Sequence, residues 1–336
     1  MLAGKLGLEN PIFLAPMGGG PGTPELAAAV SNAGGLGALA VSYLTPDEIT
    51  RTIRATRALT SKPINVNLFA GGYATSVDVP PEPVMDVMRA VHRELGLSEP
   101  VLPKLAPGPF PDQFEAVLAE RPEVFSFTFG MPGRDMIRRM HEHGITVVGT
   151  ATTVVEARTM MEAGMDAIAA QGAEAGAHRG TFIGSFEEAM VPTLELVRAI
   201  ASFATVIASG GIMDRTDVRQ MLANGAAAVQ MGTAFLPCPE SGASESWKQA
   251  LLSAGSDTTV ITRAFSGRAA RGLQNEFIKR MTGIEPLPFP VQNTLTRTMR
   301  SAAAKLGKAG FQSLWAGQGV ARCRAVPAAE LVRSLL

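Results

Sequence analysis

The chain has 336 residues, of which 46% are hydrophobic and 18% are charged, so it folds around a large core and is not intrinsically disordered. Lysine and arginine together number 30, as do aspartate and glutamate, and this formal net charge of zero argues against a nucleic acid as the main partner. The two cysteines are too few for a disulfide framework, and they fit a reducing cytosol.

We expect neither a secretion signal nor a membrane span in the N-terminal region. The first nine residues lack a long apolar core followed by a cleavage site. The Ala-rich stretch Leu26–Leu44 is interrupted by Ser31, Asn32 and glycines, which favours a helix–turn–strand unit over a transmembrane helix. We therefore expect a cytoplasmic protein without a membrane partner.

Short apolar runs alternate along the chain with segments of helical periodicity. The runs predict eight strands, at Ile12–Pro16, Leu36–Ala40, Ile64–Leu68, Val124–Phe129, Thr146–Thr150, Ala167–Ala170, Val206–Ala208 and Ala228–Met231. Helices are predicted between them at Pro24–Ala33, Pro46–Leu59, Arg134–Glu142, Val154–Ala163, Val191–Ala201 and Arg215–Ala223. This α/β alternation predicts a (β/α)₈ TIM barrel. An open, doubly wound sheet is the alternative, although such sheets usually have fewer strands.

Capping residues support these helix boundaries. Thr23 and Thr45 each precede a proline and then carboxylates, an order typical of a helix start. Gly144, Gly164 and Gly225 fall where helices are expected to end.

Two regions depart from the alternation and suggest a second domain. Residues 71–111 are rich in proline, with a predicted helix at Pro83–Leu95, and form an excursion after the third strand. Beyond Pro237 the pattern becomes mainly helical. We therefore predict a barrel over residues 1–236 and a mainly helical domain over 237–336 that covers the C-terminal mouth of the barrel, where barrel active sites lie.

The loop after the sixth strand, residues 170–180, has the most informative composition. It is rich in glycine and alanine, which lets the backbone approach a ligand closely, and it carries His178, a side chain suited to proton transfer near neutral pH. This combination favours a site for a flat cofactor and a small acidic substrate. The alternative is a tight turn with a solvent-facing histidine.

Other strand ends add polar groups at the same mouth of the barrel. Gly210-Gly211 and Gly232-Thr233 follow the seventh and eighth strands, where barrels often bind phosphate. Neither pair forms a Walker loop or a dinucleotide turn, so a mononucleotide such as FMN is favoured. The amides of Asn67 and Gln171 could face a heterocycle, or could bond to neighbouring loop backbone.

These motifs resemble the nitronate monooxygenase family, formerly called 2-nitropropane dioxygenase, and its class I in particular. The resemblance is carried by the motifs Pro16-Met-Gly18, Val66-Asn-Leu68, Gln171-Gly-x-Glu-Ala-Gly-x-His178-Arg-Gly180, Ser209-Gly-Gly-Ile212, Gln230-Met-Gly-Thr233, Phe265-Ser-Gly-Arg-Ala-Ala-Arg-Gly272 and Trp315-Ala-Gly-Gln-Gly319. It spans nearly the whole chain.

The resemblance implies a noncovalent FMN site and an oxidase chemistry. The implied FMN contacts are Met17, Gly18, Asn67, Gln171, Gly176, Gly211, Gln230, Met231, Gly232 and Thr233, with Gly317 and Gln318 of the tail closing the site. His178 is the implied catalytic base or nitronate-binding residue. The family oxidises alkyl nitronates, such as propionate 3-nitronate, with O₂ to a carbonyl compound and nitrite. No metal and no nicotinamide is required.

Three features of the chain depart from that pattern or leave it open. Ala177 stands where the family usually has glycine, so its methyl group could narrow the approach to His178 or shift the loop. The segment Phe289–Thr294 lacks the tyrosines that often line the substrate entrance, and no tyrosine follows Tyr73. Arg179 could bind a carboxylate or phosphate, or form a surface ion pair.

Several functions remain open at this stage. An NAD(P)H-dependent FMN reductase acting on quinones or enoyl thioesters is the main alternative to a nitronate monooxygenase. A catalytically silent flavin-binding protein and a flavin-free barrel that binds a sugar phosphate or nucleotide are two others. The sequence is compatible with a homodimer but does not establish one.

Overall fold

Eight parallel strands form the barrel that the sequence predicts. The computed structural model describes residues 2–71, 81–103 and 109–336. Its main sheet has the order β1-β9-β8-β6-β5-β4-β3-β2. The strands are β1 (Ile12–Leu14), β2 (Gly37–Ala40), β3 (Ile64–Phe69), β4 (Val124–Thr128), β5 (Thr146–Ala151), β6 (Ala167–Gln171), β8 (Val206–Ser209) and β9 (Ala228–Met231). Leu36 joins the two edge strands, since its N–H donates to Ile12 O and its carbonyl accepts from Leu14 N–H, both at 2.9 Å. The predicted TIM barrel is confirmed.

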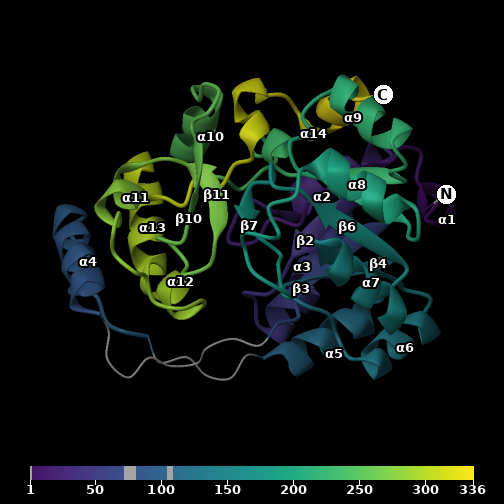
Figure 1. Ribbon diagram of the computed structural model, residues 1–336, viewed down its shortest axis with the longest axis horizontal. Coiled ribbons are helices and arrows are strands. Elements are labelled where there is room, and N and C mark those ends of the chain that lie inside the picture. Colours follow the sequence, from purple (N-terminus) through teal and green to yellow (C-terminus); the bar gives the residue numbers. More distant parts are fainter. Residues whose placement is uncertain (1, 72–80, 104–108) are drawn as a thin grey trace.

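Helices surround the strands (Figure 1). They are α2 (Pro24–Asn32), α3 (Pro46–Leu59), α5 (Phe110–Glu120), α6 (Arg134–Glu142), α7 (Val154–Ala163), α8 (Thr193–Ala201) and α9 (Arg215–Ala223), and the short α1 (Leu2–Lys5) precedes β1. Helix α5 is absent from the sequence prediction. It begins inside the Pro-rich excursion, yet it buries Phe114, Val117 and Leu118 at helical spacing against the barrel.

The predicted capping signals act as expected. Thr23 Oγ1 accepts from Leu26 N–H at 3.0 Å at the start of α2. Thr45 and Glu48 form a capping box at the start of α3. Gly164 ends α7 with φ +101°, a left-handed conformation that glycine adopts without strain.

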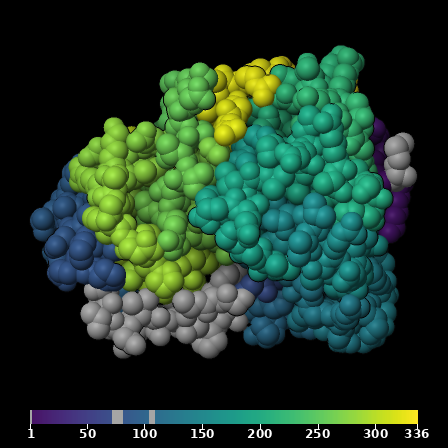
Figure 2. Space-filling view, viewed as in Figure 1, coloured from purple at the N-terminus to yellow at the C-terminus, as the bar shows by residue number. Residues whose placement is uncertain are grey.

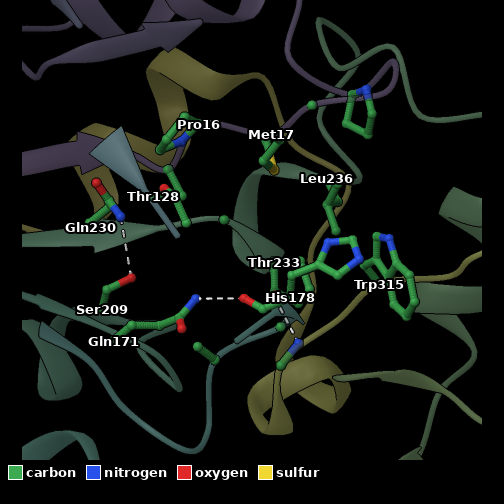
Figure 3. A pocket seen from close by; sticks show the side chains of 18 of the residues that line it. Pro16, Met17, Thr128, Gln171, His178, Ser209, Gln230, Thr233, Leu236 and Trp315 are labelled. Carbon is green, nitrogen blue, oxygen red and sulfur yellow. Dashed lines mark hydrogen bonds between the residues drawn. The ribbon is translucent and has the colours of Figure 1, made fainter. Parts of the chain in front are cut away.

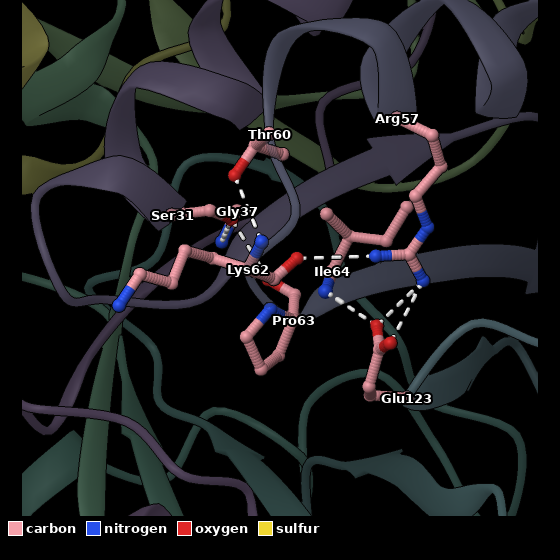
Figure 4. A network of polar contacts seen from close by, with 8 residues as sticks. All are labelled: Ser31, Gly37, Arg57, Thr60, Lys62, Pro63, Ile64 and Glu123. Atoms are coloured by element: carbon pink, nitrogen blue, oxygen red, sulfur yellow. Dashed lines mark hydrogen bonds and ion pairs between the residues drawn. The ribbon is translucent and has the colours of Figure 1, made fainter.

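A polar network at the N-terminal end of the barrel fixes where β3 begins (Figure 4). The Glu123 carboxylate accepts from Ile64 N–H at 2.9 Å and pairs with Arg57 Nη2 at 2.7 Å. Ser31 Oγ donates to Pro63 O at 2.8 Å and accepts from Gly37 N–H at 3.0 Å. These bonds tie β2, β3 and the residue before β4 together, and so set the register of the strand ends that carry the site.

A second group of elements packs beside the barrel mouth (Figure 1). This second group is mainly helical, as predicted. Its helices are α10 (Glu245–Leu252), α11 (Glu276–Arg280), α12 (Val291–Leu295) and α13 (Arg297–Lys305). A three-stranded antiparallel sheet was not predicted. It pairs β10 (Thr259–Thr262) with β11 (Ala270–Leu273), and β11 with the two-residue β7 (Ala177–His178). Because β7 contains His178, this sheet anchors the histidine loop to the second group.

Helix α4 (Glu82–Glu94) lies within the predicted excursion and packs with this second group. Its Val84, Met88 and Val91 share a hydrophobic cluster with Phe277 and Met299. The excursion also includes residues 72–80 and 104–108, which lie outside the described residues. The division into domains 1–236 and 237–336 stays a prediction.

The C-terminal tail returns to the barrel. Figure 2 shows this tail in yellow, between the barrel and the second group. Its last helix, α14 (Ala328–Ser334), packs against α2 through Leu331 and Val332 of the barrel's hydrophobic cluster. Within the described residues, no helix is long and apolar enough to cross a membrane.

Candidate functional site

A pocket at the C-terminal mouth of the barrel gathers the predicted site residues. Its lining includes His178 and every predicted cofactor contact except Gln318, namely Met17, Gly18, Asn67, Gln171, Gly176, Gly211, Gln230, Met231, Gly232, Thr233 and Gly317. These residues come from five strand ends and the tail. The second group supplies the opposite wall through Asn293, Arg300, Ser313 and Trp315.

The loops after β8 and β9 present unpaired backbone donors to this pocket. Among the described residues, the N–H groups of Gly211, Gly232 and Thr233 donate no hydrogen bond. Arg322 Nη2 donates to Gly211 O at 3.0 Å, and its Nη1 pairs with Asp214 at 2.8 Å, which fixes the first loop. Convergent free N–H groups are what a bound phosphate requires.

The tail closes the pocket between these loops and the histidine loop. Gly317 N–H donates to Thr233 Oγ1 at 2.9 Å. Gln318 N–H donates to Glu174 O at 3.0 Å, so Gln318 fastens the tail to the histidine loop. A Cβ atom on Gly176 would lie 2.6 Å from the Ala316 carbonyl carbon, which explains why glycine is needed at this crossing.

The predicted amides face the pocket and also bind their neighbours. Asn67 Nδ2 donates to Ser126 Oγ at 2.9 Å, and the described residues offer its Oδ1 no partner. Gln171 binds loop backbone at both ends, since its Nε2 donates to His178 O at 3.0 Å and its Oε1 accepts from Gly180 N–H at 2.7 Å (Figure 3). Gln171 therefore holds the histidine loop in place, as the alternative interpretation expected.

Aromatic side chains surround His178, and Trp315 lies next to it (Figure 3). The ring centroids of His178 and Trp315 lie 5.3 Å apart, and those of Phe129 and Phe289 lie 6.0 and 5.7 Å from His178. Its Nε2 lies 2.8 Å from Ser266 Oγ. Ser266 Oγ in turn donates to Arg268 O at 3.1 Å. If that hydroxyl proton points to the carbonyl, Ser266 accepts from Nε2–H and Nδ1 is the unprotonated nitrogen, which is the tautomer that we infer.

Burial keeps this imidazole neutral. Desolvation lowers the pKa of His178 to about 3, and the positive charges of Arg268 and Arg300 lower it in the same direction. A neutral imidazole can accept a proton at Nδ1 at physiological pH.

The neighbours of His178 in sequence brace its loop. Arg179 is almost fully buried and donates to the carbonyls of Gln171, Gly172 and Ala189 at 2.6 to 2.9 Å. It therefore binds neither a ligand anion nor a surface carboxylate, and both interpretations of Arg179 were wrong. Glu174 caps the start of α8 by accepting from Thr193 N–H at 2.8 Å.

Comparison with known proteins decides the family. The nitronate monooxygenase family model matches residues 1–336. The chain is 43% identical over 339 residues to the nitronate monooxygenase of Pseudomonas aeruginosa, covering 98% of this chain and 96% of that protein.

The chain belongs to the nitronate monooxygenase family.

Solved structures agree with this assignment. Nitroalkane oxidase from Streptomyces ansochromogenes is 38% identical and superposes with a TM-score of 0.89, over 98% of this chain and 95% of that one. FabK from Thermotoga maritima is 27% identical with a TM-score of 0.76, over 99% of this chain and 94% of that one. The named members of the nitronate monooxygenase family are oxidoreductases. The chain is therefore an oxidoreductase as well.

Ala177, where we expected the family's glycine, has φ +63°. A non-glycine residue in this conformation is strained by about 1–2 kcal/mol. Ala177→Gly relieves that strain and adds a flexibility cost of about 0.5–1 kcal/mol. We expect its thermal midpoint to equal or exceed that of the native chain. The control Ala170→Gly, buried in β6, should lower the midpoint. If Ala177→Gly lowers the thermal midpoint as much as Ala170→Gly does, Ala177 is not strained in the native chain.

Several pocket residues were not predicted from the sequence. Asn293 and Arg300 come from the second group, and Tyr43 follows β2. Ser266 was also missed; it is buried and contacts His178 without lining the pocket. In a segment expected to be helical, asparagine and arginine resemble surface residues. Only the tertiary fold brings Asn293 and Arg300 to the pocket.

Proposed function

We propose that this protein oxidises alkyl nitronates with O₂ in an FMN-dependent reaction that yields a carbonyl compound and nitrite. His178 acts as the base or nitronate-binding residue. One observation carries the proposal: in a chain of this family, His178 lines one pocket together with Gly211, Gly232 and Thr233, whose N–H groups donate no hydrogen bond among the described residues.

The pocket residues fit FMN. The three N–H groups would hold the phosphate, and Asn67 Oδ1 and the Gln230 amide would meet polar atoms of the ring system. A Cβ on Gly317 would lie 2.7 Å from Glu174 O, so only glycine lets the tail pass this close to the histidine loop. When bound, FMN supplies the electron transfer between substrate and O₂.

The chain's own residues prepare the substrate. Arg268 and Arg300 place positive charge near His178, which favours an anionic nitronate over its neutral nitroalkane. If the neutral nitroalkane enters, Nδ1 of His178 accepts its α-proton. Phe129, Phe289 and Trp315 exclude water from this exchange.

The neutral state of His178 predicts the pH dependence of nitroalkane oxidation. The basic form persists at every pH above its pKa of about 3. We therefore expect kcat/KM for nitroethane to show no acid limb near pH 6.5 and to stay level down to about pH 5. The measurement is an initial-rate profile of the FMN-loaded protein, with flavin occupancy checked at each pH. An acid limb centred near pH 6.5 would contradict this assignment.

Ser266 is a positioning residue, because it fixes the tautomer of His178. Ser266→Ala removes the acceptor of Nε2–H, so we expect about a tenfold or greater loss in kcat for nitroethane. The readout specific to this role is ¹⁵N NMR of the histidine-labelled protein. The native chain should show His178 protonated at Nε2, Ser266→Ala should show a mixture, and Ser266→Thr should restore the native signal. An unchanged tautomer in Ser266→Ala would remove Ser266 from this role.

Anaerobic mixing tests the proposed function against the reductase alternative. FMN-loaded protein is mixed without O₂ with ethyl nitronate or with NADH, and the flavin absorbance is followed. We expect bleaching by the nitronate and none at a comparable rate by NADH. Rapid bleaching by NADH alone would favour the reductase.

A further inference from the structure

Arg300 is a half-buried cation without a carboxylate partner among the described residues. Its side chain lines the pocket across from the barrel, and its Nε is buried without any hydrogen-bond partner among the described residues. Nη2 donates to Asn293 O at 2.7 Å and Asn293 Oδ1 at 2.9 Å, and Nη1 lies 3.4 Å from Ser313 Oγ. Within the described part of the chain, no Asp or Glu forms an ion pair with Arg300.

Two chain segments link this guanidinium to the surroundings of His178, and both residues line the same pocket. Trp315, which packs on His178, lies two residues after Ser313. Phe289, which also packs on His178, lies four residues before Asn293. The charge of Arg300 reaches His178, since it contributes to the lowered pKa of the imidazole. A short substrate can therefore meet His178 at one end and Arg300 at the other.

A cation in this position calls for an anion from outside the chain. Burial lowers the pKa of Arg300 to about 10, so the group stays charged at neutral pH while its environment disfavours the charge. A buried charge without a counter-ion is costly, and a bound anion would offset that cost. The free N–H groups suited to phosphate lie on the loops after β8 and β9, whereas Arg300 lies on α13. We therefore assign Arg300 to an anion other than the phosphate.

The anion also has a route to Arg300. A second cavity shares Tyr43, Asn293, Arg300 and Ser313 with the pocket, and Arg297 lies on its wall. Among the described residues, its lining carries two arginines and no acidic residue. This cavity thus offers an electropositive approach to the pocket.

We propose that Arg300, with Asn293 and Ser313, binds a carboxylate at the far end of the substrate and so selects nitronates that carry this second anionic group. This inference rests on the proposed function for the nitronate end of the substrate. A guanidinium matches a carboxylate with two parallel hydrogen bonds. Arg300 is thus a specificity-determining residue.

The test compares two nitronates of similar length. Propionate 3-nitronate carries the carboxylate, and propyl-1-nitronate replaces it with a methyl group. In the native protein we expect kcat/KM to favour propionate 3-nitronate by about tenfold or more. Arg300→Met should reduce this ratio by about tenfold or more, mainly through KM, while Arg300→Lys should keep part of it. Lys305→Met, an equal charge change at an exposed position of α13, should leave the ratio unchanged.

Three results would overturn the proposal. The native protein could show no preference between the two nitronates. Arg300→Met could lower both kcat/KM values equally, which would place Arg300 at the nitronate group. Loss of FMN from both Arg300 variants would instead assign Arg300 to the flavin site.

A binding measurement separates this proposal from the proposed function. Succinate offers carboxylates but no nitronate, and its binding to the FMN-loaded protein is measured by calorimetry. If neither nitronate is oxidised, the proposed function fails. Succinate binding that is lost in Arg300→Met and kept in Lys305→Met would still support the carboxylate site, and binding unaffected by Arg300→Met would contradict it.

Discussion

Replacing His178 with asparagine is expected to lower kcat/KM for nitroethane by about 10²- to 10⁴-fold, the usual contribution of a general base. Asparagine cannot accept the α-proton, whereas Nδ1 of the neutral His178 can. Ethyl nitronate has already lost that proton, so its oxidation should fall by a smaller factor. The measurement is a pair of initial-rate series, with nitroethane and with its nitronate, on protein of known FMN content.

The matched control is His141→Asn, the same change at an exposed histidine of α6 that pairs with Asp166 at 3.0 Å. It should keep native rates with both substrates. Equal losses with both substrates in His178→Asn would make His178 a nitronate-binding residue and not the base. Native rates with both substrates would remove it from the mechanism.

Gly232→Asp is expected to abolish stable FMN binding. Gly232 has φ −115°, which other residues adopt, so the substitution adds a side chain without backbone strain. Its Cβ would lie 3.3 Å from Ala15 Cβ and 3.7 Å from Met17 Sδ, on the pocket lining beside the free N–H groups. Like charges about 4 Å apart repel by about 4 kcal/mol at an effective dielectric constant of about 20, so the FMN Kd should rise about 100-fold or more.

Gly232→Asn is the control, because it has the same shape without the charge. We expect the asparagine variant to bind FMN much more tightly than Gly232→Asp, as measured by flavin fluorescence quenching. Gly211 would be a poorer choice, since its φ of +72° would strain any side chain. Similar FMN affinities for the two Gly232 variants would exclude a phosphate at this loop.

The barrel could be predicted because its signals are local. Each strand is a short apolar run, and α2, α3, α7 and α9 carry a side-chain cap in their own sequence, as at Thr45 and Glu48. Helix α5 was missed because prolines at both sides of its start obscured the helical pattern of Phe114, Val117 and Leu118. The pairing of β11 with β7 joins residues about ninety positions apart, which no local pattern indicates.

The site residues show the same difference between local patterns and tertiary packing. Gly211, Gly232 and His178 were found from the sequence because parallel strands bring their C-terminal ends to one mouth of the barrel. Arg300 reaches the same pocket and Ser266 reaches His178 from the second group, by packing that the sequence does not encode locally. Arg179 shows the opposite error: it resembled an anion ligand, yet the fold buries it among three carbonyls.

The most direct test of the account is the oxidation of propionate 3-nitronate by purified, FMN-loaded protein, with O₂ uptake and nitrite release followed together and NADH alone as the control. We predict nitrite formation coupled to O₂ uptake without NADH. No nitrite from FMN-loaded protein, together with flavin bleaching by NADH, would contradict the proposed function and identify a reductase built on the same barrel.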